Sequence, residues 1–130
     1  MSRSDSNDVP PAALDAGPGV YEMTPAELDA RRRGPAPPTV VDVREPWEYA
    51  LARLPRARPV PLGALADDPL GTLGAAGVDP ARPVVVYCHH GARGRTAVGR
   101  LRAAGVTRVT NLAGGIERWS VEVDAGVARY

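Results

Sequence analysis

A single cysteine stands where a buried strand is expected to meet a loop that contains glycine. Residues 84–87 are Val-Val-Val-Tyr, a short apolar run typical of a strand covered on both faces. Cys88 follows directly, and the next six residues include two glycines and Arg93. Apolar residues at helical spacing over 97–104, with Gly105 after them, predict a helix behind the loop. The sequence thus predicts a strand, a tight loop and a helix, with a thiol at the end of the strand.

This arrangement favours nucleophilic chemistry at sulfur. A short loop that enters a helix turns successive backbone N–H groups inward, where they can hold an anion. The helix dipole adds about half a positive charge at the same end. Both effects favour the thiolate, which is the reactive form of cysteine. Arg93 adds a fixed cation that can bind an oxyanion through two parallel hydrogen bonds. The residues alone therefore indicate that Cys88 is a thiolate nucleophile inside an anion-binding loop.

The hexapeptide that begins at Cys88 and ends at Arg93 resembles the active-site loop of the rhodanese (thiosulfate sulfurtransferase-like) family. In that family the cysteine opens a six-residue loop and takes up a sulfane sulfur as a persulfide. The resemblance implies that Cys88 is catalytic. It also implies a persulfide cradle made of the following residues: His89, His90, Gly91, Ala92, Arg93 and Gly94. Phosphatases and arsenate reductases of similar fold place the arginine one residue later, and Gly94 occupies that position here. The spacing favours sulfur, with a phosphatase or arsenate reductase as the alternative.

Further charged residues are expected at the same edge of the sheet. Residues 39–43 predict a second strand, so Asp42 and Arg44 lie at its carboxyl end, which is the functional edge of an open α/β sheet. The tetrapeptide Asp-Val-Arg-Glu that contains them resembles a second rhodanese motif, in which the acid and the arginine support the active-site side of the domain. An ion pair without a catalytic part is the alternative for both. Arg95 is a third supporting candidate, because its position in the first helical turn lets it face an anionic donor.

The two histidines, His89 and His90, do not fit a protease or a metal site. A cysteine protease needs a histidine from a distant part of the chain, whereas both histidines directly follow Cys88. Three consecutive residues wrap one metal ion poorly, and the sequence offers no second cluster of ligands. We expect the histidines to contribute backbone donors, or one imidazolium to add positive charge near neutral pH. The sequence therefore implies neither a metal nor an organic cofactor.

The remaining pattern predicts an α/β fold of the rhodanese type, an open, mainly parallel five-stranded sheet with helices on both faces. The segments expected to form strands are 20–23, 39–43, 58–61, 84–87 and 108–112. Residues 24–27, Thr-Pro-Ala-Glu, fit a capping box that opens a first helix. Residues 62–77 are expected to form a loop and a weak helix. Gly114 and Gly115 resemble the start of the last rhodanese helix, and we expect them to let the chain pass close to the active-site loop.

Residues 52–57 depart from the family pattern. They read Ala-Arg-Leu-Pro-Arg-Ala where many rhodaneses carry Gly-His-Ile-Pro-Gly-Ala. Arg53 replaces the histidine and Arg56 replaces the second glycine. We therefore expect a more basic rim around the active site.

Size and composition limit the remaining functions. The chain has 130 residues, about one domain, which we divide into a mobile, Pro-rich tail over 1–19 and a rhodanese-like domain over 20–130. A net charge of +1 argues against nucleic acid or an anionic membrane as a partner. We expect no membrane span, because no apolar run approaches ~18 residues. One cysteine cannot form an internal disulfide, which fits a reducing, cytoplasmic setting.

The resemblance implies a sulfurtransferase with a small anionic donor such as thiosulfate. The acceptor would be a thiol, cyanide or a sulfur-carrier protein. Residues 119–130 resemble the end of rhodanese domains fused to adenylyltransferases that feed sulfur to carrier proteins, although the chain contains no Gly-x-Gly-x-x-Gly nucleotide loop. A non-catalytic interaction module is a further alternative.

Overall fold

The computed structural model describes residues 22–130. The tail expected over 1–19 and the first two residues of the expected first strand lie outside the described residues. Within residues 22–130, one five-stranded sheet has the order β1-β5-β4-β2-β3, and every neighbouring pair is parallel. The strands are β1 (Glu22–Met23), β2 (Thr39–Asp42), β3 (Arg58–Pro59), β4 (Val84–Tyr87) and β5 (Val109–Leu112). The α/β fold class predicted from the sequence is confirmed.

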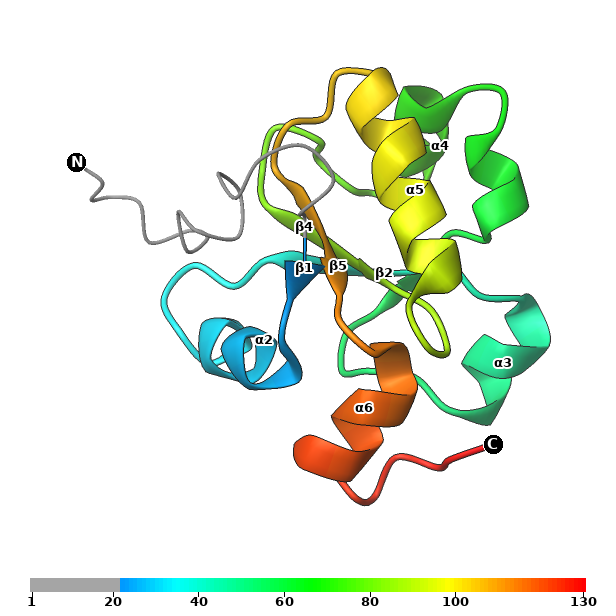
Figure 1. Ribbon diagram of the computed structural model, residues 1–130. Helices are drawn as coiled ribbons and strands as arrows, with labels where there is room; N and C mark the ends of the chain where they lie inside the picture. The colour runs from blue at the N-terminus through cyan, green and yellow to red at the C-terminus, as the bar shows by residue number, and fades with distance from the viewer. Residues whose placement is uncertain (1–21) are drawn as a thin grey trace.

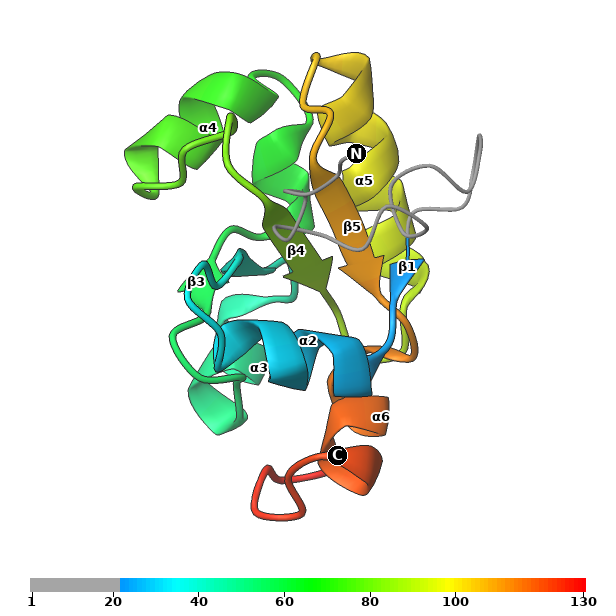
Figure 2. The ribbon, with the colours of Figure 1, turned by 90° about the vertical axis from the view of Figure 1, so that its left-hand side faces the viewer.

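Helices cover both faces of the sheet (Figures 1 and 2). The helices of the described part are α2 (Pro25–Arg32), α3 (Pro46–Leu51), α4 (Pro69–Ala75), α5 (Ala92–Ala103), α6 (Gly115–Glu122) and a short 3₁₀ helix, η1 (Leu62–Leu65). One core cluster joins η1, α4 and α5 to the sheet, and a second joins α2 and α6 to its other face. The layers are therefore helix, sheet and helix.

The central strand β4 explains both the apolar run and the direction in which the thiol points. Val84, Val86 and Cys88 belong to the core cluster on the α5 side. Val85 and Tyr87 belong to the cluster on the α2 and α6 side. Because both faces are covered, no polar residue alternates with the valines. The same alternation directs Cys88, the residue after the strand, toward the start of α5.

Two expectations about helices have different outcomes. The capping box is confirmed, because the Glu27 amide donates to Thr24 Oγ1 at 3.2 Å and the Thr24 amide donates to Glu27 Oε1 at 2.8 Å. The weak helix expected over 62–77 is instead two short helices whose leucines, Leu65 and Leu73, are fully buried. Asp68 is the signal for α4, since its carboxylate accepts from the Gly71 amide at 3.0 Å.

Within residues 22–130, none of the helices has both the length and the apolar character that crossing a membrane requires.

Candidate active site

The Cys88 sulfur lies between two backbone amides at the carboxyl end of β4. Cys88 Sγ accepts from the Gly91 amide at 3.0 Å and from the Gly94 amide at 3.3 Å. Cys88 is only 1% exposed, so the sulfur lies beneath the loop and not on the open surface. Amide dipoles aimed at one atom stabilise negative charge there. The geometry therefore suits a thiolate, or a sulfur anion bonded to it.

The loop is shorter than the sequence suggested. Helix α5 begins at Ala92, so Arg93 and Gly94 belong to its first turn and the loop proper is His89 to Gly91. Gly91 precedes the helix with φ of 122°, a conformation that residues with a side chain rarely adopt. This turn brings the positive end of the α5 dipole next to the sulfur.

Asn111 of β5 lies against both residues whose amides face the sulfur. Its Nδ2 donates to the Gly91 carbonyl oxygen at 3.1 Å. Its Oδ1 lies where a side chain at position 94 would begin, since a Cβ built on Gly94 would be 1.9 Å from it. Asn111 is 1% exposed and cannot move aside into solvent. The sulfur cradle therefore requires the Asn111 side chain, and it requires that residue 94 has no side chain.

The start of α6 fixes the other end of the loop. The Ile116 amide donates to the Cys88 carbonyl at 2.9 Å, and the Glu117 amide donates to the His89 carbonyl at 3.1 Å. A Cβ at Gly115 would lie 2.4 Å from both carbonyl oxygens. This close approach confirms the expectation that the glycine pair lets the chain pass beside the active-site loop.

The Arg93 guanidinium forms an ion pair with the Glu48 carboxylate of the same chain. Its two terminal nitrogens donate to Glu48 Oε1 at 2.6 Å and Oε2 at 2.9 Å. The Glu48 side chain is 4% exposed and that of Arg93 is 34% exposed. The hydrogen bonds from Arg93 lower the pKa of Glu48 to about 2, although burial acts in the opposite direction. Arg93 thus anchors the start of α5 to α3, and only its partly exposed edge is available to a donor.

A buried network continues from Glu48 to the second motif. The Tyr130 hydroxyl donates to Glu48 Oε2 at 2.7 Å, and Arg44 Nη1 donates to the Tyr130 hydroxyl at 2.6 Å. Burial, together with the Glu48 hydrogen bond, raises the pKa of Tyr130 to about 12. Arg44 binds the Asp42 carboxylate through Nε at 2.9 Å and Nη2 at 2.6 Å. Asp42 and Arg44 therefore form the ion pair that the sequence left open, and no hydrogen bond joins either residue to the sulfur.

The network returns to the residue before the cysteine. The Tyr87 hydroxyl donates to Asp42 Oδ2 at 2.7 Å, and burial raises the pKa of Tyr87 above its usual value. Charged and phenolic groups therefore link Tyr87, immediately before Cys88, to Arg93, five residues after it. The two sides of the active-site loop are fixed to one another through α3 and the second motif.

The His89 ring stacks between the rings of His90 and Tyr130. The ring of His89 lies 3.9 Å from that of His90 and 3.9 Å from that of Tyr130. Burial, with a contribution from His90, lowers the pKa of His89 and so favours its neutral form. His89 is therefore a poor source of the positive charge considered from the sequence. In residues 22–130 no three His, Cys, Asp or Glu side chains gather as metal ligands.

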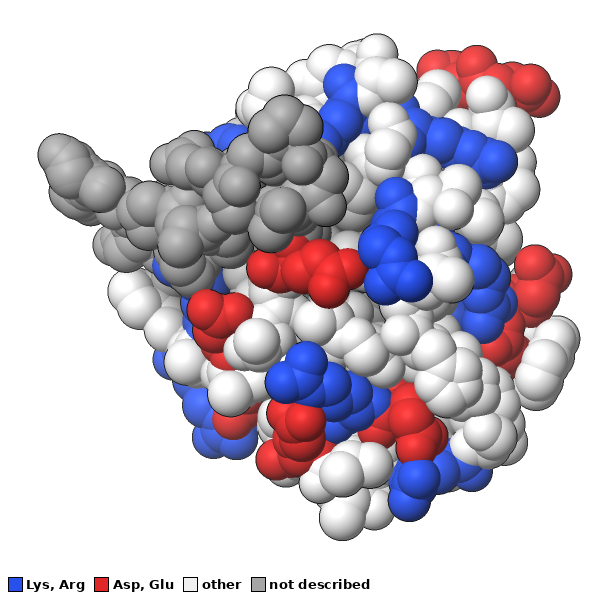
Figure 3. All heavy atoms as spheres, in the orientation of Figure 1, with Lys and Arg blue, Asp and Glu red and all other residues white. Residues whose placement is uncertain are grey.

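Arg95 pairs with the edge strand. Its Nη1 lies 3.5 Å from Glu22 Oε2 of β1, and its side chain is 60% exposed. A Cβ at Gly91 would be 3.2 Å from the same nitrogen, so the guanidinium lies over the loop. Positive and negative side chains alternate on this face of the molecule (Figure 3). The site therefore has no broad field of one sign to attract a donor.

Residues 24–122 match the sequence profile of the rhodanese-like domain. The chain belongs to the rhodanese-like domain family. A sulfurtransferase of Allochromatium vinosum is 32% identical over 78% of this chain and 89% of that protein. The adenylyltransferase and sulfurtransferase MOCS3 of Drosophila sechellia is 34% identical over 72% of this chain but only 21% of that protein.

Solved structures agree with this assignment. The crystal structure of a rhodanese-like domain protein from Staphylococcus aureus has a TM-score of 0.67 at 26% identity, covering 84% of this chain and 97% of that chain. Some relatives are much longer, since the chain spans 30% of a chloroplastic rhodanese-like/PpiC domain protein of Arabidopsis thaliana and 64% of a Bacillus subtilis protein. The family assignment therefore applies to the domain that they share.

Sequence reasoning missed three residues that build the site of this rhodanese-like domain. The pairing of Glu48 with Arg93 gave no local signal in the sequence. Glu48 also closes a capping box by accepting from the Glu45 amide at 3.0 Å. Asn111 offered one signal, a polar amide inside a buried strand just before the glycine pair. Tyr130 offered none, since its partner Glu48 is 82 positions away in the chain.

The two arginines expected to make the active-site rim basic have different surroundings. Arg56 lines a pocket with Gly34 and Thr39, at the amino end of β2. Arg53 donates to the Tyr49 carbonyl at 3.0 Å, at the end of α3. The expectation of a more basic rim is wrong for Arg56, because the parallel strands place that pocket at the opposite edge of the sheet from Cys88.

Proposed function

We propose that this rhodanese-like domain is a sulfurtransferase that carries a sulfane sulfur on Cys88 as a persulfide. The observation that carries the proposal is the pair of amides, Gly91 and Gly94, that donate to the sulfur. The sulfurtransferase of Allochromatium vinosum, which aligns with most of this chain, supports the same class of reaction.

In the first step the Cys88 thiolate attacks the outer sulfur of thiosulfate. A bond forms between Sγ and that sulfur as its bond to the sulfonate sulfur breaks, and the electron pair leaves with sulfite. The persulfide that results carries a negative charge on its outer sulfur. The inward amides of the cradle are the groups that stabilise this charge, because they are fixed before the reaction begins.

In the second step a nucleophilic acceptor attacks the outer sulfur. With cyanide the products are thiocyanate and the Cys88 thiolate, and with a thiol the product is an acceptor persulfide. A sulfur-carrier protein with a free thiol would accept the sulfur in the same way. No metal or organic cofactor takes part in this scheme.

In this scheme Arg93 lies beside the cradle and binds the donor, not the sulfur anion. Glu48 takes two of its N–H groups, and the remaining donors lie on a side chain that is one-third exposed. These remaining donors can bind the sulfonate oxygens of the donor. The ion pair with Glu48 thus keeps the Arg93 guanidinium beside the loop and away from the thiolate.

Intact mass spectrometry after thiosulfate treatment tests the proposal. Wild-type protein should gain the mass of one sulfur atom, cyanide should remove it, and Cys88→Ser should gain nothing. The melting temperature of Cys88→Ser, compared with that of wild type, controls for misfolding. If folded wild type with a free thiol gains no sulfur, the proposal is wrong. Hydrolysis of an aryl phosphate by that protein would then favour a phosphatase.

A further inference from the structure

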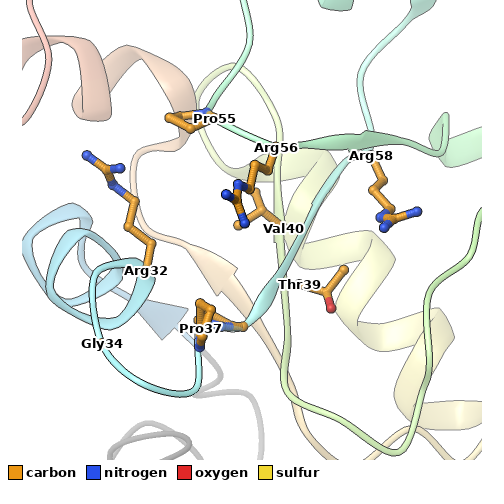
Figure 4. A pocket seen from close by; sticks show the side chains of 9 residues that line it. Arg32, Gly34, Pro37, Thr39, Val40, Pro55, Arg56 and Arg58 are labelled. Atoms are coloured by element: carbon orange, nitrogen blue, oxygen red, sulfur yellow. The ribbon is translucent and has the colours of Figure 1, made fainter.

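A pocket lies at the amino-terminal ends of the parallel strands, whereas the Cys88 sulfur lies at their carboxyl-terminal ends. The pocket has a volume of about 500 Å³ and lies between the end of α2, the start of β2 and the turn before β3 (Figure 4). Its lining residues include three prolines and three arginines: Pro37, Pro38, Pro55, Arg32, Arg56 and Arg58. Thr39 at its edge pairs with Val84, which begins β4, so the pocket is one strand length away from Cys88. The sulfur chemistry proposed above does not use it.

Arg56 occupies a backbone position that favours glycine. The Ala57 amide donates to the Leu54 carbonyl at 3.2 Å and closes a tight turn with Pro55 and Arg56 at its centre. Arg56 has φ of 59°, and among the described residues it is the one with a side chain that has positive φ. Turns with proline at the first central position and positive φ at the second normally carry glycine there. An arginine in this conformation costs backbone strain, which directs attention to what its side chain does.

The Arg56 guanidinium has no protein partner within residues 22–130, where no hydrogen bond or ion pair involves it. In Figure 4 it points into the pocket, above Val40. Arg32 borders the other wall and is already paired with Asp29 at 2.8 Å. Arg58 points away from the pocket and donates to the Ala76 carbonyl at 3.1 Å. Of the three arginines that line the pocket, Arg56 is the one that points into it without a hydrogen bond or ion pair to a described residue, and none of the lining residues is acidic.

The wall around this cation combines prolines and Val40 with polar and charged side chains. Prolines lie on both sides of the pocket, and Val40 forms part of its surface. Ligand pockets in proteins typically combine apolar walls with a few polar groups that fix orientation. A planar guanidinium suits a phosphate or carboxylate, which it can bind through two parallel hydrogen bonds. We propose that this pocket binds a small organic anion, with its phosphate or carboxylate group on Arg56 and its apolar part against the prolines.

Phenylphosphonate and benzoate are suitable probes, because they carry the two kinds of anionic group on the same apolar ring. Both should be titrated into full-length Cys88→Ser protein, which lacks the thiol, while backbone amide signals are followed by NMR. We expect saturable shifts at Val40 and Ala57 with at least one probe and none there with phenol. The better of the two probes identifies the anionic group that the pocket prefers.

Arg56→Gly is the decisive variant, since it removes the cation and supplies the residue that the turn favours. Its melting temperature should be no lower than that of the parent protein, while its affinity for the probe falls by at least about tenfold. Arg33→Ala is the matched control. Arg33 is 65% exposed at the end of α2 and does not line the pocket, so its loss should change the affinity by less than about threefold. Equal binding by Arg56→Gly and its parent, or no binding of either probe at millimolar concentration, would overturn the proposal.

Discussion

Charged side chains are arranged differently at the two ends of the parallel strands. At the carboxyl edge, Arg93 and Arg44 are matched by the carboxylates of Glu48 and Asp42, and the reactive sulfur faces neutral amides. At the amino edge, Arg56 faces an open pocket without a partner. The difference indicates that charged side chains build the frame of the sulfur site, whereas backbone dipoles contact the sulfur itself.

This division follows from the cost of buried charge. An ion held out of water is costly unless it is paired, so an open cation next to a buried sulfur would be expensive. Backbone amides carry no net charge and still stabilise an anion when several point at it. The ion pairs fix the elements around the loop, while Asn111 and the start of α6 hold the loop that carries those amides. The open pocket at the other end of the strands has no such requirement, because it faces solvent.

The largest effect should come from Gly94→Ala. The new Cβ would meet Asn111 Oδ1, so either the start of α5 or Asn111 must move and the Gly94 amide leaves the sulfur. We expect kcat/KM for sulfur transfer to fall by about 10²-fold or more, as when a preorganised donor is lost from an oxyanion site. Gly99→Ala in the same helix is the control, since nothing lies within 4 Å of its Cβ position. A Gly94→Ala enzyme as active as Gly99→Ala would show that the amide is dispensable.

Asn111→Ala should have the next largest effect. It removes the hydrogen bond to the Gly91 carbonyl but adds no clash. We expect about tenfold slower transfer, because a loosened loop loses part of its amide alignment, and a loss of about 1–3 kcal/mol in the free energy of unfolding. Steady-state kinetics and urea unfolding measure the two effects. A variant that loses stability but transfers sulfur at the wild-type rate would limit Asn111 to a structural role.

Glu48→Gln should act chiefly on donor binding. The glutamine is nearly the same size but cannot neutralise Arg93, whose guanidinium becomes free to shift over the loop. We expect KM for thiosulfate to change by several-fold while kcat changes less, because the amides around the sulfur stay in place. Thiosulfate kinetics under saturating acceptor measure the split. An equal loss in kcat would mean that Glu48 contributes to the transition state.

The pairing of Glu48 with Arg93 should also make stability depend on pH. The pKa of Glu48 is about 2 in the folded protein, below its usual value of 4.5. A lowered folded pKa contributes stability above pH 4.5, and this contribution disappears as the pH falls toward 2. It amounts to at most about 3 kcal/mol. Urea unfolding between pH 7 and pH 2 should show a steeper acid loss for wild type than for Glu48→Gln, and identical slopes would contradict the assignment.

Local signals in the sequence predicted the strand, the loop and the position of Cys88, because each depends on neighbouring residues. The partners of that unit could not be found in this way. Glu48 is 45 positions from Arg93, and in the structure it also closes a capping box with Glu45. Asn111 reaches Gly91 across 20 positions through the pairing of β4 with β5, which only the sheet order reveals.

The start of α5 shows a second reason why the sequence did not predict the whole site. Arg93 and Gly94 looked like loop residues, since glycine is a poor helix former. The sulfur site overrides that preference, because helical geometry at Gly94 is what turns its amide toward Cys88. Arg56 shows the reverse, a side chain in a turn position where local preference favours glycine.

Persulfide formation in two variants tests the central claim most directly, that amides and not a side-chain cation hold the sulfur anion. The double variant Arg93→Met with Glu48→Met removes the ion pair without leaving a charge unpaired. At saturating thiosulfate, intact mass spectrometry should find the extra sulfur on the double variant and not on Gly94→Ala. A folded double variant that carries no persulfide, beside a Gly94→Ala protein that loads like wild type, would contradict the account.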